Sequence, residues 1–158
     1  YQNLGSVKTD GFEFESKTIF NNNLSASLGV SLPNGEEDGG ELSTLSPDTA
    51  KIALTYNSDN NKFRWNTITS IVKSSPKLDP ISQRGGPPLP AQTTSGRVTF
   101  DTYFSYDITL KLNMKLGIRN ITDVKYWDLP TVSGQAEGTA DEYLMPGRNA
   151  SFSLRYSF

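Results

Sequence analysis

The chain has 158 residues with neither cysteine nor histidine, a composition that excludes disulfides and any metal or catalytic site built on these side chains. Its net charge is -2 and its lysines and arginines are scattered along the chain, which argues against nucleic acid as a partner. The mean hydropathy is -0.48, and no run approaches the ~18 consecutive apolar residues that a membrane-spanning helix needs.

Seven segments alternate between apolar and polar residues, and this period of two predicts β-strands. In the last segment, Phe152 and Leu154 fall on one face, and Ser153 and Arg155 fall on the other. Such a pattern suits a membrane barrel, because each barrel strand shows lipid only one of its two faces. In chain order, the predicted strands are residues 9–19, 24–32, 48–57, 62–73, 97–106, 109–120 and 148–158.

The connections between these strands alternate strictly between short and long. The short ones are 21–23, 58–61 and 107–108, and the long ones are 33–47, 74–96 and 121–147. Bacterial outer-membrane barrels have this asymmetry, with short turns toward the periplasm and long loops toward the outside. We therefore expect Phe158 at the periplasmic interface. We expect the acidic, glycine-rich residues 33–41 and the proline-rich residues 74–96 to lie outside any sheet.

Three motifs resemble the TonB-dependent receptor family in their order and spacing. The chain begins Tyr-Gln-Asn at residues 1–3 and continues with Gly-Phe-Glu at 11–13. Asn-Ile-Thr-Asp follows at 120–123, with Tyr126 close behind, and Pro-Gly-Arg stands at 146–148. The chain starts on Tyr1 without a signal-peptide pattern, so we expect a piece of a longer protein.

The resemblance implies an all-β fold, namely an antiparallel transmembrane β-barrel segment that occupies residues 1–158. These would be the last seven strands of a barrel of roughly 22, closed by an N-terminal plug. It also implies a receptor and active transporter rather than an enzyme, located in the bacterial outer membrane. Its partners would be the outer-membrane lipid, the plug and remaining strands, and the periplasmic energy-coupling protein TonB.

Within the family, Tyr126-Trp127 and residues 146–149 are most similar to receptors for haem, haemoglobin or haemophores. This implies haem as the transported ligand and an extracellular haem-carrier protein as a further partner. A siderophore receptor of the same family is the alternative. Because the segment has no histidine, we predict that it holds no cofactor itself. Tyr126 and Tyr143 offer oxygen ligands, but anchors at the membrane interface are the favoured interpretation.

The candidate ligand-binding residues lie in the two longest outer loops, since arginine and aromatic side chains dominate binding hot spots. They are Arg84, Tyr126, Trp127 and Asp128. No catalytic or metal-binding residue is predicted. The acidic set Glu36, Glu37, Asp38 and Glu41 is interpreted as a solvated loop rather than a calcium site. A charged lumen wall is predicted for Glu13, Glu15, Lys17, Lys51, Arg64, Lys111, Lys115 and Arg119.

Two other classes of protein compete with this interpretation. A soluble β-sandwich binding module also has short alternating strands, but one face of each sheet would be a packed core. A passive porin shares the barrel, and only the family motifs argue against it. The alternating faces fit both a sandwich and a barrel, but a sandwich does not require the strict alternation of long and short connections or the terminal aromatic residue Phe158.

Overall fold

The computed structural model of the chain describes residues 6–37, 40–42, 45–75, 80–82, 84–132 and 134–158. The strands are β1 Val7–Ile19, β2 Leu24–Glu37, β3 Gly40–Glu41, β4 Thr49–Asn57, β5 Phe63–Val72, β6 Arg97–Thr109, β7 Leu112–Arg119 and β8 Asn149–Tyr156. Two helical turns, α1 Leu129–Val132 and η1 Ala140–Tyr143, lie between β7 and β8. No helix in the described residues is long and apolar enough to cross a membrane.

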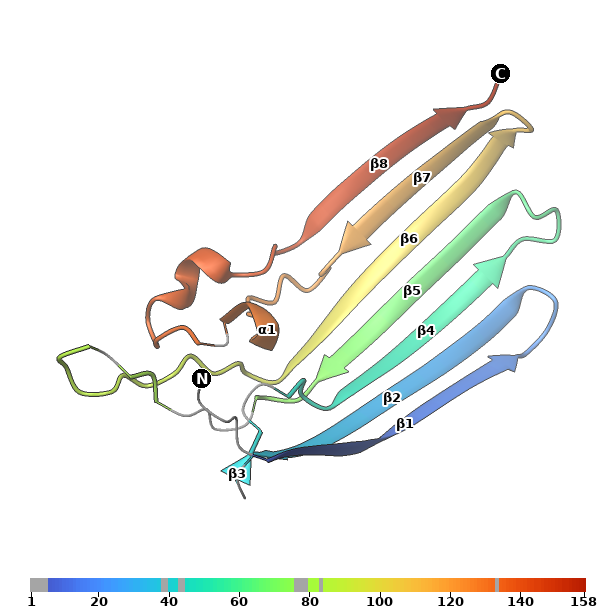
Figure 1. The fold of residues 1–158 in the computed structure, drawn as a ribbon. Coiled ribbons are helices and arrows are strands. Elements are labelled where there is room, and N and C mark those ends of the chain that lie inside the picture. Colours follow the sequence, from blue (N-terminus) through green and yellow to red (C-terminus); the bar gives the residue numbers. More distant parts are fainter. Residues whose placement is uncertain (1–5, 38–39, 43–44, 76–79, 83, 133) are drawn as a thin grey trace.

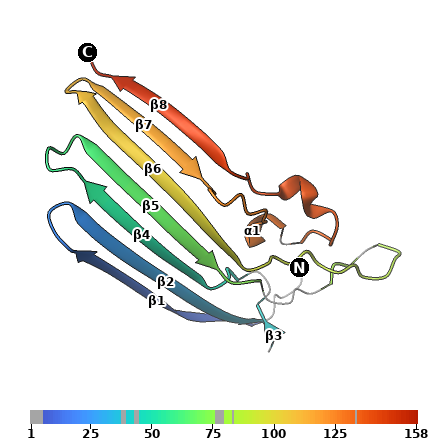
Figure 2. The same ribbon diagram turned by 180° about the vertical axis from the view of Figure 1, so that it is seen from behind.

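The seven long strands of the described chain form one antiparallel sheet in the order β1-β2-β4-β5-β6-β7-β8 (Figure 1). Each pairs with its neighbour in sequence, which is the up-and-down connectivity of a membrane barrel wall. The sheet does not close on itself, because β1 and β8 lie at opposite edges in both views (Figures 1 and 2). The predicted antiparallel barrel segment is therefore confirmed.

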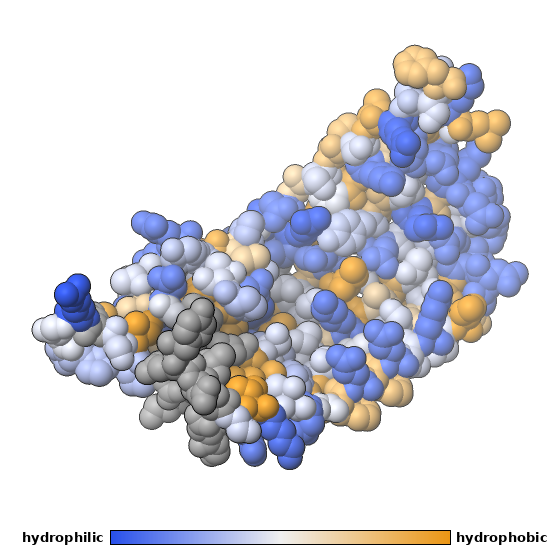
Figure 3. Space-filling model, viewed as in Figure 1, coloured by the Kyte–Doolittle hydropathy of each residue, from blue (hydrophilic) through white to orange (hydrophobic). Residues whose placement is uncertain are grey.

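The strand register places the alternating residues on two chemically different faces. Ile52 pairs with Leu28 on one side and Thr69 on the other, whereas its neighbour Ala53 pairs with Ser27 and Ile68. One face thus carries the apolar residues, and the other carries most of the charged and hydroxyl side chains. The face seen in Figure 3 is largely hydrophilic over the middle strands.

The apolar face is not covered by any part of the described chain. Ile52 is 42% exposed and Phe152 is 66% exposed, and the buried hydrophobic residues of the described chain are Leu129 and Val132, which lie in a loop. A β-sandwich would bury one face of such a sheet. An exposed apolar face that extends over all the long strands instead suits contact with lipid.

Aromatic side chains gather on the apolar face at the end of the sheet that carries the short turns. Phe63 lies with its ring centroid 6.3 Å from that of Tyr56 and 6.3 Å from that of Phe104. The rings of Tyr156 and Phe158 meet edge to face at 5.3 Å. Such a band is typical of a membrane–water interface, and Phe158 lies in it as expected.

The turn predicted at 107–108 is wrong by a few residues. β6 continues to Thr109, and Leu110 and Lys111 form the turn instead, so Lys111 does not lie on the lumen wall. The register shifts between Asp107 and Thr109, which marks a bulge at the inserted residue. The hydroxyl of Thr109 accepts a hydrogen bond from the backbone N–H of Lys111 at 3.2 Å and stabilises the displaced turn.

The prediction that residues 33–41 lie outside the sheet is also wrong. β2 runs on to Glu37 and pairs with β1 as far as Val7, and β3 adds two further pairs. Pro33 is tolerated there because the pairing of β2 with β4 ends at Ser31, so the missing N–H interrupts no ladder with β4. Residues 1–3 and Asp38, which the sequence analysis singled out, lie outside the described residues.

Gly117 on the polar face of β7 leaves room for the ring of Tyr103. A Cβ at residue 117 would lie 2.9 Å from Ser151 Oγ and 3.1 Å from the Tyr103 ring. We expect Gly117→Ala to lower the stability of the full receptor by about 1 kcal/mol through overpacking, measured by urea unfolding in lipid vesicles. Gly29→Ala is the matched control, because a Cβ there meets nothing within 4 Å. Equal losses from both variants would contradict this account.

Candidate functional site

The loops 74–96 and 121–147 leave the same end of the sheet and contact each other. Ala91 and Ala136 form an isolated antiparallel bridge. It is closed by hydrogen bonds from the N–H of Gln92 to the carbonyl of Gln135 and from the N–H of Glu137 to the carbonyl of Pro90, both 2.8 Å. These are the long connections, so this surface is the outer mouth of the barrel wall.

The 121–147 loop has a small core of its own. Leu129 and Val132 in α1 are 2% and 0% exposed. The carbonyl of Asp128 accepts hydrogen bonds from the N–H groups of Thr131 at 3.0 Å and Val132 at 3.3 Å. Burying two aliphatic side chains gives the loop a defined shape, which a solvated connection of this length would lack.

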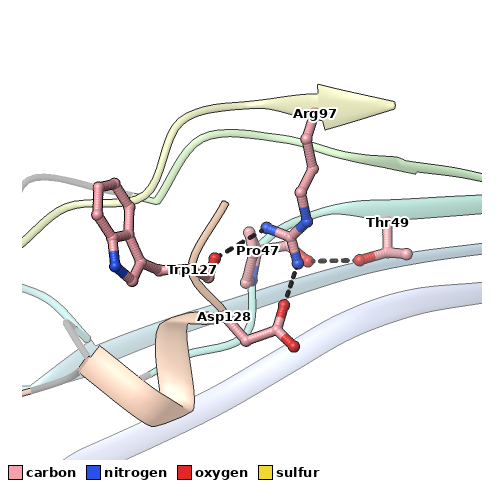
Figure 4. Close-up of polar contacts among 5 residues, drawn as sticks. All are labelled: Pro47, Thr49, Arg97, Trp127 and Asp128. Carbon is pink, nitrogen blue, oxygen red and sulfur yellow. Dashed lines mark hydrogen bonds and ion pairs between the residues drawn. The ribbon is translucent and has the colours of Figure 1, made fainter. Parts of the chain in front are cut away.

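Arg97 contacts three of the predicted ligand-binding residues, of which Figure 4 shows Trp127 and Asp128. Its guanidinium forms an ion pair with the carboxylate of Asp128 and donates to the carbonyl of Trp127 at 3.3 Å. It also lies 4.3 Å from the ring centroid of Tyr126, in a cation–π contact. The Arg97 side chain is only 11% exposed, which strengthens these contacts relative to a surface pair.

Sequence reasoning missed Arg97 because it begins a strand some thirty residues before the loop it binds. One signal was available. Arg97 has the same parity along β6 as Thr99, Asp101 and Tyr103, so it lies on the polar face. An arginine at the outer end of that face is well placed to meet an inward-folding loop.

Burial raises the pKa of the Tyr126 phenol, and the nearby carboxylate of Asp128 raises it further against the opposing effect of Arg97. Binding of ferric iron through the phenolate oxygen requires loss of the phenol proton, which the raised pKa makes harder for Tyr126 than for an exposed tyrosine. Tyr143 lies in η1 and is 38% exposed.

Arg84 does not belong to this cluster. It occupies an exposed turn between Ile81 and Leu89, whose backbones exchange hydrogen bonds of 2.8 and 2.9 Å. This part of the loop extends away from the sheet (Figure 1). The four predicted residues therefore occupy two separate places at the outer end.

The two motifs at 120–123 and 146–148 fasten β8 to the end of β7. Asn120 is 4% exposed, and its side chain exchanges hydrogen bonds of 2.9 and 3.0 Å with the backbone of Val124. The carboxylate of Asp123 accepts a hydrogen bond of 2.7 Å from the N–H of Arg148. The Gly147 backbone lies against the same carboxylate. These motif residues thus have a structural role at the entry to the last strand.

The polar face is hollowed over β5 to β8 and carries more positive than negative charge. The ion pairs among the described residues are Lys73–Asp48 and Arg97–Asp128, so the other cations of this face have no carboxylate partner within that part of the chain. The basic residues that line the hollow are Lys62, Arg64, Lys115, Arg119 and Arg155. A charged wall of this kind suits a lumen and not a lipid contact.

An open antiparallel sheet with an apolar outer face, a charged inner face and folded outer loops defines the wall of a membrane β-barrel. Residues 1–121 match the family model described as "TonB dependent receptor-like, beta-barrel". The chain belongs to this family, whose members are bacterial outer-membrane receptors and not enzymes.

Solved structures of similar fold cover nearly the whole chain. They include the copper transporter OprC at TM-score 0.78 and 17% identity, covering 96% of this chain and 23% of that one. The FrpB iron transporter from Neisseria meningitidis has TM-score 0.76 and 18% identity, with 99% and 24% covered. The ferripyoverdine receptor of the outer membrane of Pseudomonas aeruginosa has TM-score 0.74 and 20% identity, with 96% and 20% covered.

The chain therefore spans about a fifth to a quarter of the length of these proteins. No curated protein sequence matches it. At these identities the similarity shows the fold and leaves the ligand open.

Proposed function

We propose that the complete protein is an energy-coupled receptor that imports an iron compound across the bacterial outer membrane. In this proposal residues 1–158 form the C-terminal part of the barrel, its last seven strands of roughly 22. The proposal rests on two features seen together. The sheet has an exposed apolar face, and the long loops 74–96 and 121–147 are folded against each other at its outer end. Membership of the TonB-dependent receptor family supplies the transport class.

The partners that we propose follow from the two open edges of the sheet and from the basic residues of its polar face. The outer edges of β1 and β8 need the remaining barrel strands, because an open sheet edge is not stable in lipid. We propose that the N-terminal plug lies in the lumen against the basic residues of the polar face, where its anionic groups would find charge partners. We propose that TonB acts on this plug from the periplasmic side.

The outer mouth suits an anionic iron chelate with flat or aromatic surfaces. Arg84 is exposed, and Tyr126 and Trp127 are half-buried beside Arg97. Haem with its propionates has this chemistry, and so do many ferric siderophores. From the resemblance at Tyr126-Trp127 we propose more specifically that the iron compound is haem, delivered to the receptor by an extracellular carrier protein. Within residues 146–149, the N–H of Arg148 is hydrogen-bonded to Asp123, a structural contact that requires no particular ligand, so a ferric siderophore is the alternative to haem.

The test is direct binding and uptake by the full-length receptor. Purified receptor in lipid vesicles is titrated with haemin, with ferric siderophores of catecholate and hydroxamate type, and with copper(II). We expect tight binding and TonB-dependent uptake of one iron chelate. Tight binding of haemin alone supports the haem proposal, and binding of one siderophore class supports the alternative. Uptake that continues without TonB, or uptake of copper alone, would overturn the proposed function.

Arg84→Ala is expected to weaken binding of the chelate that the panel identifies. Loss of one exposed arginine contact to an anion should raise the Kd roughly tenfold, the effect of a single hot-spot arginine. Lys125→Ala is the matched control, since Lys125 is also an exposed cation on an outer loop. A change of less than about twofold for Arg84→Ala would remove it from the binding surface.

A further inference from the structure

Backbone contacts fasten the first long loop to the outer end of the sheet. The N–H of Ser75 donates to the carbonyl of Thr94, and the N–H of Thr94 donates to the hydroxyl of Ser75, both at 2.9 Å. Ser75 lies just after the end of β5, and Thr94 lies just before the start of β6. The Ala91–Ala136 bridge then joins this loop to the second long loop. The outer mouth is therefore built on a fastened framework.

Three consecutive residues of the second loop are each held by a contact to another part of the chain. The carbonyl of Tyr126 accepts a hydrogen bond of 3.0 Å from the N–H of Met145. The carbonyl of Trp127 accepts one of 3.3 Å from Arg97, and the carboxylate of Asp128 pairs with the same guanidinium. The backbone that carries the two aromatic side chains is thus fixed on one side by Met145 and on the other by Arg97.

The charge of Arg97 is already engaged within the protein. Its side chain is 11% exposed, Asp128 balances its charge, and its Cζ atom lies 4.3 Å from the ring centroid of Tyr126. An anion from outside would have to displace the carboxylate of Asp128, and separating a partly buried pair is costly. Arg97 therefore acts on other residues of the protein and not directly on a ligand.

The two aromatic side chains keep part of their surface at the outer mouth. Figure 4 shows the indole of Trp127 turned away from Arg97, although the Trp127 carbonyl points toward it. Tyr126 and Trp127 are both half-buried. Side chains that are held in place before binding lose little conformational freedom when a ligand contacts them.

We propose that Arg97 is a positioning residue, which fixes Tyr126 and Trp127 as an aromatic surface for the flat face of an iron chelate. The charge of Arg97 itself does not bind the chelate. This inference rests on the proposed receptor function. It assigns different roles to two arginines of the outer mouth, because Arg97 acts through the placement of aromatic rings and the exposed Arg84 acts through its charge.

Asp128→Asn distinguishes the two possible roles of Arg97, because they predict effects of opposite sign. The full-length receptor in lipid vesicles is titrated with haemin and with a ferric tris-catecholate, at about 1 M salt to screen the general effect of removing a negative charge. If Arg97 bound the chelate, loss of the carboxylate would free the guanidinium and tighten binding. As a positioning residue Arg97 loses its anchor, so we expect the Kd to rise roughly threefold. Tighter binding would overturn the proposal.

Arg97→Met removes the positioning residue itself. We expect the Kd of the chelate that binds to rise roughly tenfold, and to do so equally at low salt and at about 1 M salt. Lys73→Met is the matched control, because it breaks the other ion pair of the outer end, in which the lysine side chain is 69% exposed. It should change the Kd less than about twofold. Equal effects of the two variants, or an Arg97→Met effect that vanishes at high salt, would overturn the proposal.

A third measurement needs no ligand. The full-length receptor is labelled with 5-fluorotryptophan, and the fluorine resonance of Trp127 is assigned by its loss in Trp127→Phe. We expect Arg97→Met to displace and broaden this resonance, because the indole then samples more than one orientation. Trp65 is the internal control, since its indole N–H donates to Thr102 at 2.8 Å and does not depend on Arg97.

This measurement separates the positioning role from the proposed function. An unmoved Trp127 resonance in Arg97→Met would overturn Arg97 as the positioning residue, whatever the receptor binds. A wild-type receptor that binds neither haemin nor the ferric tris-catecholate, while the Trp127 resonance shifts as expected, would count against the proposed function alone.

Discussion

Ile52→Arg is expected to impair membrane insertion of the full receptor. Ile52 lies near the middle of β4 on the apolar face, between Leu28 and Thr69, and is 42% exposed. Placing an arginine there, near the bilayer midplane, costs about 2–4 kcal/mol. Urea unfolding in lipid vesicles and the yield of folded protein in the outer membrane measure the loss.

Ala53→Arg is the matched control for this prediction. Ala53 is the next residue of β4, at almost the same depth, but it lies on the polar face between Ser27 and Ile68. An arginine there stays in the lumen, so we expect a change within about 0.5 kcal/mol. Equal losses would show that the two faces do not differ in environment, and a larger loss for Ala53→Arg would show that the assignment of the faces is inverted.

The faces and the order of the strands could be predicted from the sequence because side chains alternate with a period of two. Phe152 and Arg155 differ in parity, and β8 indeed places them on opposite faces. The bulge before Thr109 could not be predicted this way. One extra residue moves the side chains that follow it to the opposite face, and nothing else in the sequence indicates where it is inserted. The extension of β2 past Pro33 was missed because the pattern does not show where β4 stops being its neighbour.

The outer cluster was only half predictable for a related reason. Tyr126 and Trp127 attracted notice as aromatic residues in a long loop, but their orientation depends on Arg97 in another strand. Contacts between a loop and a distant strand follow from the packing of the loop around Leu129 and Val132. No local spacing in the sequence encodes them. The family motifs, by contrast, were recognisable by spacing alone, and for those at 120–123 and 146–148 the structure shows the contact that joins them.

Gly147→Val is expected to detach the start of β8 from the end of β7. A Cβ at residue 147 would lie 2.6 Å from Asp123 Oδ1, the atom that accepts the Arg148 N–H at 2.7 Å. The carboxylate cannot keep this hydrogen bond and avoid the new side chain. Lost hydrogen bonding and overpacking together should cost about 3 kcal/mol, measured by urea unfolding of the full receptor.

A double-mutant cycle with Asp123→Gly shows whether the carboxylate is the cause. Asp123 has a φ of 57°, a conformation that glycine adopts without strain, so Asp123→Gly removes the carboxylate and little else. Alone it should lose the hydrogen bond to Arg148, at about 1.5–3 kcal/mol. Adding Gly147→Val should then cost much less than it does in the wild type, because no oxygen remains to collide with the valine. Fully additive losses would mean that Gly147 is required for some other reason, and that the spacing between the two motifs is not explained by this contact.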